Sequence, residues 1–249
     1  MEMIRKIVAI GGGDSGRVRP DGTREPYETE AIDREIVRLA GCGHPHFLYL
    51  AHSMITPDGE KERAAFDTAS AVFGGRFGCE CRQLLSADVE ADANAAEEAI
   101  GWADIIYEAG GNTFAMLNFW RDHGLYVLLR GAWEAGKVMS GASAGAICWF
   151  KYGNTDHPAF INRPVNAIPA LGFINAYFAP HCDAPGKRES VNRSIKKLGM
   201  TAVSVSNCCA LEIVGDSWRV IRGDGSARGL EPYVLKTTYE GGKLHEEFL

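Results

Sequence analysis

A serine between small residues is the most reactive pattern in the chain. Residues 141–145 read Gly-Ala-Ser-Ala-Gly, after a short apolar run and before a helical pattern. This is the G-x-S-x-G signature of a nucleophile elbow, where a serine on a strained backbone stands between a strand and a helix. The following helix N-terminus offers free N–H groups to an oxyanion. The pattern predicts Ser143 as a nucleophile; the alternative is a serine that only caps a helix.

A serine nucleophile needs a base, and the base needs an orienting acid. His181 is the best base, because it ends a predicted strand, at the edge where open α/β sheets bind ligands. Most other histidines are expected at the surface, and His157 is a second candidate because it follows Asp156. Asp156, in the loop just beyond the elbow, is the favoured acid. Asp183, two residues after His181, is the alternative acid.

An oxyanion hole needs two backbone donors aimed at one point. The N–H of Ala144, next after the serine, is one candidate. The turn Gly110-Gly111-Asn112-Thr113 follows another predicted strand, and glycine there allows a close approach to substrate. Gly111 is the expected second donor and Asn112 a candidate substrate contact. The alternative is an ordinary turn glycine.

Strands and helices alternate along the first two thirds of the chain. Strands are predicted at 4–10, 47–51, 82–85, 105–108 and 173–179, and helices at 30–40, 60–73, 91–103, from 113, 126–135 and 188–198. This alternation predicts a mostly parallel sheet covered on both faces. Short strands at 202–206, 211–214, 218–221 and 233–238 predict an antiparallel extension. No linker or repeat appears, so we expect one domain over 1–249.

Composition restricts the partners and the compartment. The 249 residues carry a net charge of −6, which argues against nucleic acid and anionic membranes as partners. No apolar run reaches the ~20 residues that span a bilayer. Seven cysteines lack metal-finger spacing and predict free thiols in the cytoplasm. Cys79 with Cys81, and Cys208 with Cys209, are weak metal-site candidates. The sequence leaves the oligomeric state open, with a homodimer as one option.

Four segments together resemble one known family. The stretches A-G-G-N-T-F (109–114), G-A-S-A-G-A (141–146), N-T-D-H-P (154–158) and A-L-G-F-I-N-A-Y-F-A-P-H (170–181) are similar to the serine peptidase family of aspartyl dipeptidase (dipeptidase E) and cyanophycinase. The match is good over 105–185 and loose before it. It implies a flavodoxin-like three-layer α/β fold, related to class I glutamine amidotransferases, and no metal or organic cofactor.

The resemblance also implies roles for individual residues. Ser143 matches the nucleophile, His181 the base, and Gly111 with Ala144 the oxyanion donors. Asp156 matches the acid of the dipeptidase branch, although its spacing from the serine is shorter here, and cyanophycinase-like members place the acid differently. The substrates of the family, N-terminal aspartyl dipeptides and a polymer of aspartate with arginine branches, both involve aspartyl groups.

The main hypothesis is a cytoplasmic serine peptidase that acts on small peptides, with aspartyl or β-aspartyl-linked peptides as the class to test. The first alternative keeps the elbow in an esterase or amidase. The second alternative is a non-catalytic, ligand-binding protein of the same fold. The sequence alone does not identify a residue that would recognise an aspartyl carboxylate.

Overall fold

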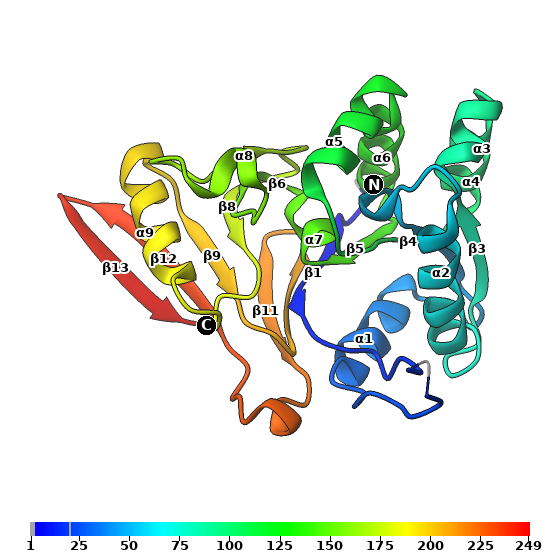
Figure 1. The fold of residues 1–249 in the computed structure, drawn as a ribbon, viewed down its shortest axis with the longest axis horizontal. Helices are drawn as coiled ribbons and strands as arrows, with labels where there is room; N and C mark the ends of the chain where they lie inside the picture. Colours follow the sequence, from blue (N-terminus) through cyan, green and yellow to red (C-terminus); the bar gives the residue numbers. More distant parts are fainter. Residues whose placement is uncertain (1–2, 20) are drawn as a thin grey trace.

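The computed structural model describes residues 3–19 and 21–249, and their strands form two sheets (Figure 1). The larger sheet contains β1 (Lys6–Gly12), β2 (His46–Leu50), β3 (Glu80–Leu84), β4 (Ile105–Glu108), β5 (Val138–Ala142), β10 (Cys209–Val214) and β11 (Ser217–Arg222). The smaller sheet contains β6 (Phe150–Gly153), β7 (Ile168–Pro169), β8 (Ile174–Ala179), β9 (Ala202–Val205), β12 (Val234–Glu240) and β13 (Lys243–Phe248).

The larger sheet is parallel over most of its width. Its order is β11-β10-β1-β5-β4-β2-β3, and the five strands from β1 to β3 run parallel. Only β10 and β11 are antiparallel additions at the β1 edge. The smaller sheet has the order β13-β12-β9-β8-β6-β7, in which β6, β8 and β9 are parallel. The C-terminal strands, expected as one extension, are therefore divided between the two sheets.

Helices cover both faces of the larger sheet. The helices are α1 (Glu30–Ala40), α2 (Glu60–Phe73), α3 (Ser86–Ala91), α4 (Ala95–Trp102), α5 (Thr113–Asp122), α6 (Leu125–Glu134), α7 (Ala144–Ile147), α8 (Pro158–Ile161) and α9 (Lys187–Leu198), with 3-10 turns η1 (His52–Met54) and η2 (Ser226–Arg228). Buried residues of α1 and α2 form one apolar cluster with the sheet. Buried residues of α3 to α6 form another on the opposite face.

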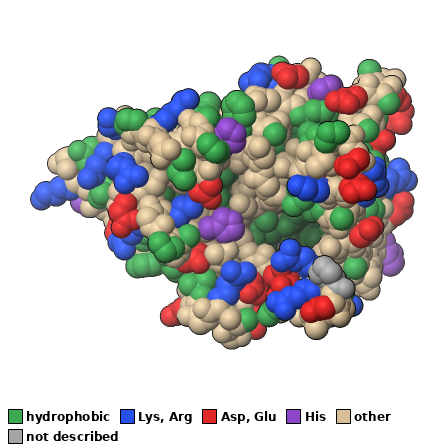
Figure 2. All heavy atoms as spheres, in the orientation of Figure 1, with side chains coloured by type: hydrophobic (Ala, Val, Ile, Leu, Met, Phe, Trp, Pro, Cys, Tyr) green, Lys and Arg blue, Asp and Glu red, His purple; other side chains and the backbone are tan. Residues whose placement is uncertain are grey.

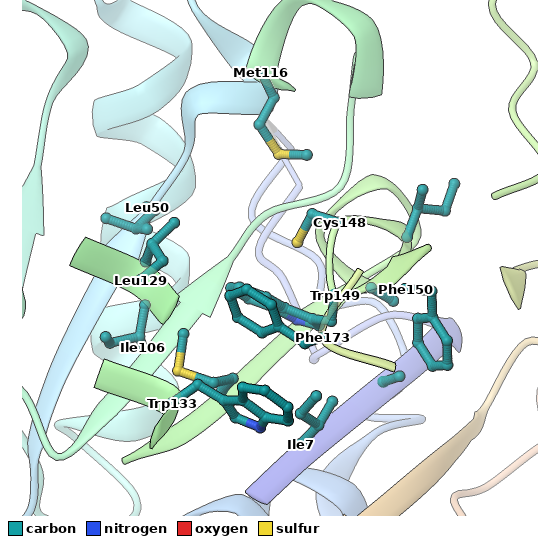
Figure 3. Packing of buried hydrophobic residues seen from close by; sticks show 14 of the residues in the cluster. Ile7, Leu50, Ile106, Met116, Leu129, Trp133, Cys148, Trp149, Phe150 and Phe173 are labelled. Carbon is teal, nitrogen blue, oxygen red and sulfur yellow. The ribbon is translucent and has the colours of Figure 1, made fainter. Parts of the chain in front are cut away.

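The second cluster also joins the two sheets. It combines Ile7 of β1 with Phe178 of β8 and Val203 of β9. Figure 3 shows Trp149 and Phe173 packed between Trp133 on one side and Phe150 on the other. Continuous packing of this kind holds the strands of both sheets in a fixed relation. The single domain over 1–249 stays a prediction.

The predicted elements mostly exist, and the differences have local causes. The helix expected at 91–103 begins later, as α4 at Ala95, after a turn in which the Asp92 side chain accepts a hydrogen bond from the Asn94 N–H (2.9 Å). Helix α3, which ends at Ala91, was not expected. The helix after the elbow is a single turn, α7, since the chain enters β6 at Phe150. Strands β6, β7 and β13 were not expected. Among the described residues, no helix combines the length and apolar character needed to cross a bilayer.

A buried carboxyl group connects α1 to the loop before it. Asp33 is 2% exposed and accepts hydrogen bonds from the hydroxyls of Thr29 (2.8 Å) and Tyr27 (3.0 Å). Burial disfavours the charged form and raises the pKa of Asp33 to about 7, although the hydroxyl donors act in the opposite direction. Folding therefore favours the protonated form of this side chain.

This raised pKa predicts a pH-dependent stability. The contribution of Asp33 is fully present below its ordinary pKa of 3.8 and is lost as the pH rises through about 7. In Asp33→Asn, we expect the free energy of unfolding in urea to fall less between about pH 4.5 and pH 8 than in wild type, by on the order of a few kcal/mol. Asp67→Asn, which changes an exposed acid on α2, should keep the wild-type slope. Equal slopes in all three proteins would contradict the assignment.

Candidate active site

Ser143 lies at a sharp turn between β5 and α7. Its backbone φ is 53° and ψ is −110°, so this non-glycine residue is strained. Its flanking glycines are needed because the turn presses on β4: a Cβ on Gly145 would lie 2.1 Å from the Glu108 carbonyl oxygen, and one on Gly141 would lie 2.4 Å from the Gly145 carbonyl oxygen. The one-turn α7 lacks the dipole of a long helix, so only its local N–H groups are available to stabilise an oxyanion.

His181 follows β8 and reaches the serine. Its Nε2 is 3.0 Å from Ser143 Oγ, and both side chains are half-buried. The His181 backbone also has a positive φ, 52°. The structure therefore brings together the predicted nucleophile and the predicted base at hydrogen-bond distance.

An amide, not a carboxylate, contacts the other nitrogen of this histidine. Asn207 Oδ1 is 2.7 Å from His181 Nδ1. The Asn207 Nδ2 and backbone N–H donate to the two oxygens of Asp183, at 2.8 and 2.7 Å. Because a carboxylate only accepts, Asp183 fixes the orientation of the amide with Oδ1 toward the ring. The Nδ1 must then carry the proton, which leaves Nε2 free to accept from the serine hydroxyl.

Asp183, the alternative acid, thus acts on His181 through Asn207. Burial alone would raise the pKa of Asp183, but the hydrogen bonds from Asn207 outweigh this effect and hold the pKa below its ordinary value. The carboxylate is therefore charged at neutral pH. Its charge attracts the Nδ2 group of Asn207 and so keeps Oδ1 of the same amide on the imidazole.

Asp156, the favoured acid, contacts Lys187 and not His181. Its side chain is 70% exposed and accepts a hydrogen bond from Lys187 Nζ at 2.6 Å. Both ring nitrogens of His181 are already occupied by Ser143 and Asn207. The second candidate base, His157, instead caps α8 by accepting from the Ala159 N–H (3.2 Å).

The glycines that end β1 hold the segments of the site together. Three consecutive carbonyls, those of residues 10–12, accept hydrogen bonds from the N–H groups of Ser143, His181 and Cys208 at 3.0, 3.2 and 2.8 Å. A Cβ on Gly12 would lie 2.3 Å from both His181 Cε1 and Asn207 Oδ1. Ser143, His181 and Cys208 are the non-glycine residues with positive φ in the described part of the chain. Backbone strain is thus concentrated at this site.

Two backbone N–H groups near the serine are available to a ligand. Neither the Gly111 N–H nor the Ala144 N–H donates to a protein acceptor within 3–19 and 21–249. Gly111 has a φ of 154°, and a Cβ there would lie 2.5 Å from the Ser53 carbonyl oxygen. The Asn112 N–H donates to that same oxygen (2.8 Å), which braces the turn. The Asn112 side chain caps α5 through the Ala115 N–H (3.1 Å) and also lines the adjoining cavity.

A cavity of about 320 Å³ opens beside the serine and contains a charged pair. Ser143, His181, Asp156 and Lys187 are among its lining residues. The Lys187 side chain is 11% exposed, and its Nζ donates to Asp156 Oδ1 and, at 3.3 Å, to Asn154 Oδ1. An ammonium group has three donors, so one remains for a bound molecule.

Two fully buried polar residues, His52 and Glu108, lie near the site. His52, expected at the surface, is fully buried and accepts from Trp120 Nε1 (2.8 Å); burial lowers the pKa of His52 to about 3. Glu108 is also fully buried, and burial raises its pKa well above the ordinary value. Its Oε1 accepts from the Ser53 N–H (3.0 Å), so Glu108 supports the turn that carries Gly111.

The sequence analysis missed Asn207 and Lys187. Asn207 follows a predicted strand, so the rule that selected His181, a polar residue at a strand's carboxyl end, would have found it. Lys187 had no such signal, because a lysine at a helix start is usually solvated. All seven cysteines are free thiols. In the described ranges, no three His, Cys, Asp or Glu side chains gather as metal ligands would.

The fold and the site define an α/β protein with a serine nucleophile elbow. The chain belongs to peptidase family S51, whose model matches residues 28–221. Among curated proteins, it is 36% identical over 115 residues to the peptidase YgaJ of Bacillus subtilis (strain 168), covering 45% of this chain and 48% of that one. It is 32% identical over 135 residues to Peptidase E of Shewanella denitrificans, covering 50% of this chain and 57% of that one. The chain thus spans about half the length of these relatives.

Solved structures show the same fold at low sequence identity. A peptidase from an acI-B1 Actinobacterium matches with a TM-score of 0.69 and 17% identity, over 100% of this chain and 97% of that one. A putative Peptidase E protein from Listeria monocytogenes EGD-e matches with a TM-score of 0.60 and 16% identity, over 89% of this chain and 100% of that one. The family resemblance and the flavodoxin-like α/β fold predicted from the sequence are confirmed.

Proposed function

We propose that this protein is a serine-type peptidase that hydrolyses small peptides through an acyl-enzyme. The observation that carries the proposal is the 3.0 Å contact between Ser143 Oγ and His181 Nε2 at a strained elbow. Membership in family S51 supports the same reaction class. A cytoplasmic location stays a prediction.

The reaction would begin with Ser143 Oγ attacking the scissile carbonyl carbon. The hydroxyl proton passes to His181 Nε2, and the carbonyl oxygen becomes an oxyanion held by the Gly111 and Ala144 N–H groups. Removal of one such donor typically costs about 3 kcal/mol of transition-state stabilisation. His181 then gives the proton to the leaving amine, and the C–N bond breaks. Water repeats the sequence on the Ser143 ester and releases the acid.

Asn207 would serve as the positioning residue for the base. Its Oδ1 accepts from the Nδ1–H, so it holds the neutral ring in the tautomer that can accept the serine proton. Asp183 supplies the negative charge one hydrogen bond farther away. A Ser–His–Asn arrangement has the same logic as a triad with an acid, since the third member fixes tautomer and orientation.

The charged pair in the cavity supports peptides with an acidic first residue as the substrate class. An N-terminal aspartyl residue carries an ammonium and a side-chain carboxylate, and the cavity offers one group of each opposite sign. Lys187 Nζ keeps one donor for the substrate carboxylate, and the exposed Asp156 carboxylate can accept from the ammonium. The pair therefore favours peptides that begin with an acidic residue.

A fluorophosphonate tests the nucleophile. We expect one covalent adduct per wild-type chain by intact-mass analysis and none on Ser143→Ala, because the reagent needs an activated serine. The labelling rate of His181→Ala should fall by on the order of 100-fold or more, since general-base catalysis is lost. Labelling that persists in Ser143→Ala would overturn the proposal, as would a wild type that neither labels nor hydrolyses an aspartyl-dipeptide panel.

The positioning role of Asn207 is tested by its truncation. In Asn207→Ala, we expect kcat for aspartyl-leucine to fall by about 100-fold with little change in KM, because the ring loses its fixed orientation. Asp183→Asn should lower kcat less, because the amide keeps its contact with His181. Circular dichroism checks that both variants fold. A wild-type kcat in Asn207→Ala would contradict the role.

Asp156 and Lys187 should affect binding rather than turnover. We expect Asp156→Asn to raise KM for aspartyl-leucine by about fivefold with a nearly unchanged kcat, because an exposed ion pair with the substrate ammonium is lost. An N-acetylated substrate, which has no ammonium, should be insensitive to the substitution. A large fall in kcat without a change in KM would instead restore Asp156 as the acid of a triad.

A further inference from the structure

A second cavity lies on the other side of the serine elbow. Its volume is about 490 Å³, and it lies at the carboxyl ends of β1, β2, β4 and β5, beside α2. Tyr49, Met54, Ala65 and Tyr107 give it an apolar lining. Figure 2 shows this face of the molecule hollowed near its centre, with hydrophobic side chains in the hollow and both basic and acidic side chains around it.

The second cavity touches the catalytic residues through their neighbours in sequence. Ala142 and Gly110 line it, and they precede Ser143 and Gly111, which line the first cavity. Gly13 lines it as well and follows Gly12, which packs on the ring of His181. The two cavities therefore flank the elbow. For a peptide whose amino-terminal residue occupies the first cavity, the second is therefore the adjacent candidate site for the part beyond the scissile bond.

Positive charge is available at the edge of the second cavity. Lys61 lines it from the exposed face of α2, and its Nζ has no ion-pair or hydrogen-bond partner among the described residues. Arg17 lines it from the loop after β1, 61% exposed and paired with Asp14 at 2.9 Å. An apolar hollow with a free ammonium at its edge is complementary to an apolar residue that ends in a carboxylate.

The hollow also extends away from the serine. A neighbouring cavity of about 580 Å³ shares Ser15, Arg17 and Thr68 with it and continues between α2 and the loop before α1. The combined space is larger than one residue needs. A leaving segment of two residues therefore has room, with its carboxylate farther from Lys61.

We propose that the second cavity is the leaving-group subsite, which takes a large apolar residue on its floor and reads the free C-terminal carboxylate with Lys61. This inference rests on the proposed peptidase function and adds a specificity to it. The preferred substrate is then a dipeptide with an acidic first residue and an apolar second residue. Lys61 contacts the leaving group and takes no part in bond breaking.

The test compares aspartyl-leucine with its C-terminal amide, which lacks the carboxylate. We expect the wild type to hydrolyse the free acid with a kcat/KM about fivefold above that of the amide, the size of an exposed ion pair. Lys61→Ala should abolish this ratio by raising KM for the free acid. Ala64→Glu, which adds a negative charge from an exposed position on the same lining, should reverse the ratio. Lys196→Ala, an exposed lysine on α9 away from both cavities, is the matched control.

Two results would overturn the inference, and they are distinguishable. If the wild type hydrolyses both substrates and Lys61→Ala keeps the wild-type ratio, the subsite assignment is wrong while the peptidase function stands. If the wild type hydrolyses neither and does not label with the fluorophosphonate, the proposed function fails and the subsite with it. A higher kcat/KM for aspartyl-glycine than for aspartyl-leucine would also contradict the apolar floor.

Discussion

The site depends on the absence of side chains at the end of β1. The carbonyls of residues 10–12 accept one hydrogen bond each from the N–H groups of Ser143, His181 and Cys208, which belong to three different segments. Gly11 and Gly12 have no room for a Cβ, because Ser206, Asn207 and His181 occupy that space. The glycines at the end of β1 are thus explained by packing. It allows three chain segments to meet at one strand end.

The hydrogen bonds of the site fix the proton of the neutral His181 ring on Nδ1. Asp183 can only accept, so it orients Asn207, and Asn207 in turn orients the imidazole with its free Nε2 toward Ser143. A neutral amide at the third position avoids placing a carboxylate directly on the ring. The negative charge of Asp183 still lies one group away, where it would stabilise the charged imidazole that the proposed reaction forms.

The sequence predicted the fold class and the proximity of Ser143 and His181 better than the rest of the candidate site. Ser143 and His181 belong to local patterns, a small-residue elbow and a strand end, which can be recognised from a few consecutive residues. Asn207 and Lys187 depend on which loops meet in space, and no local pattern encodes that. Asp156 was favoured for its place in the loop beyond the elbow and its motif match, and its side chain instead contacts Lys187. The division of the last strands between two sheets was also missed, because strand patterns do not reveal partners.

Ser143 and His181 belong to different sheets, and this has a consequence for the proposed activity. Ser143 follows β5 of the larger sheet, whereas His181 follows β8 of the smaller one, and Asn207 lies where the chain crosses from β9 to β10. A displacement of one sheet against the other by about 1 Å would break the 3.0 Å contact between them while both sheets stay folded. If the proposed peptidase activity is correct, mild denaturant should therefore abolish turnover at concentrations that leave the helices and strands folded.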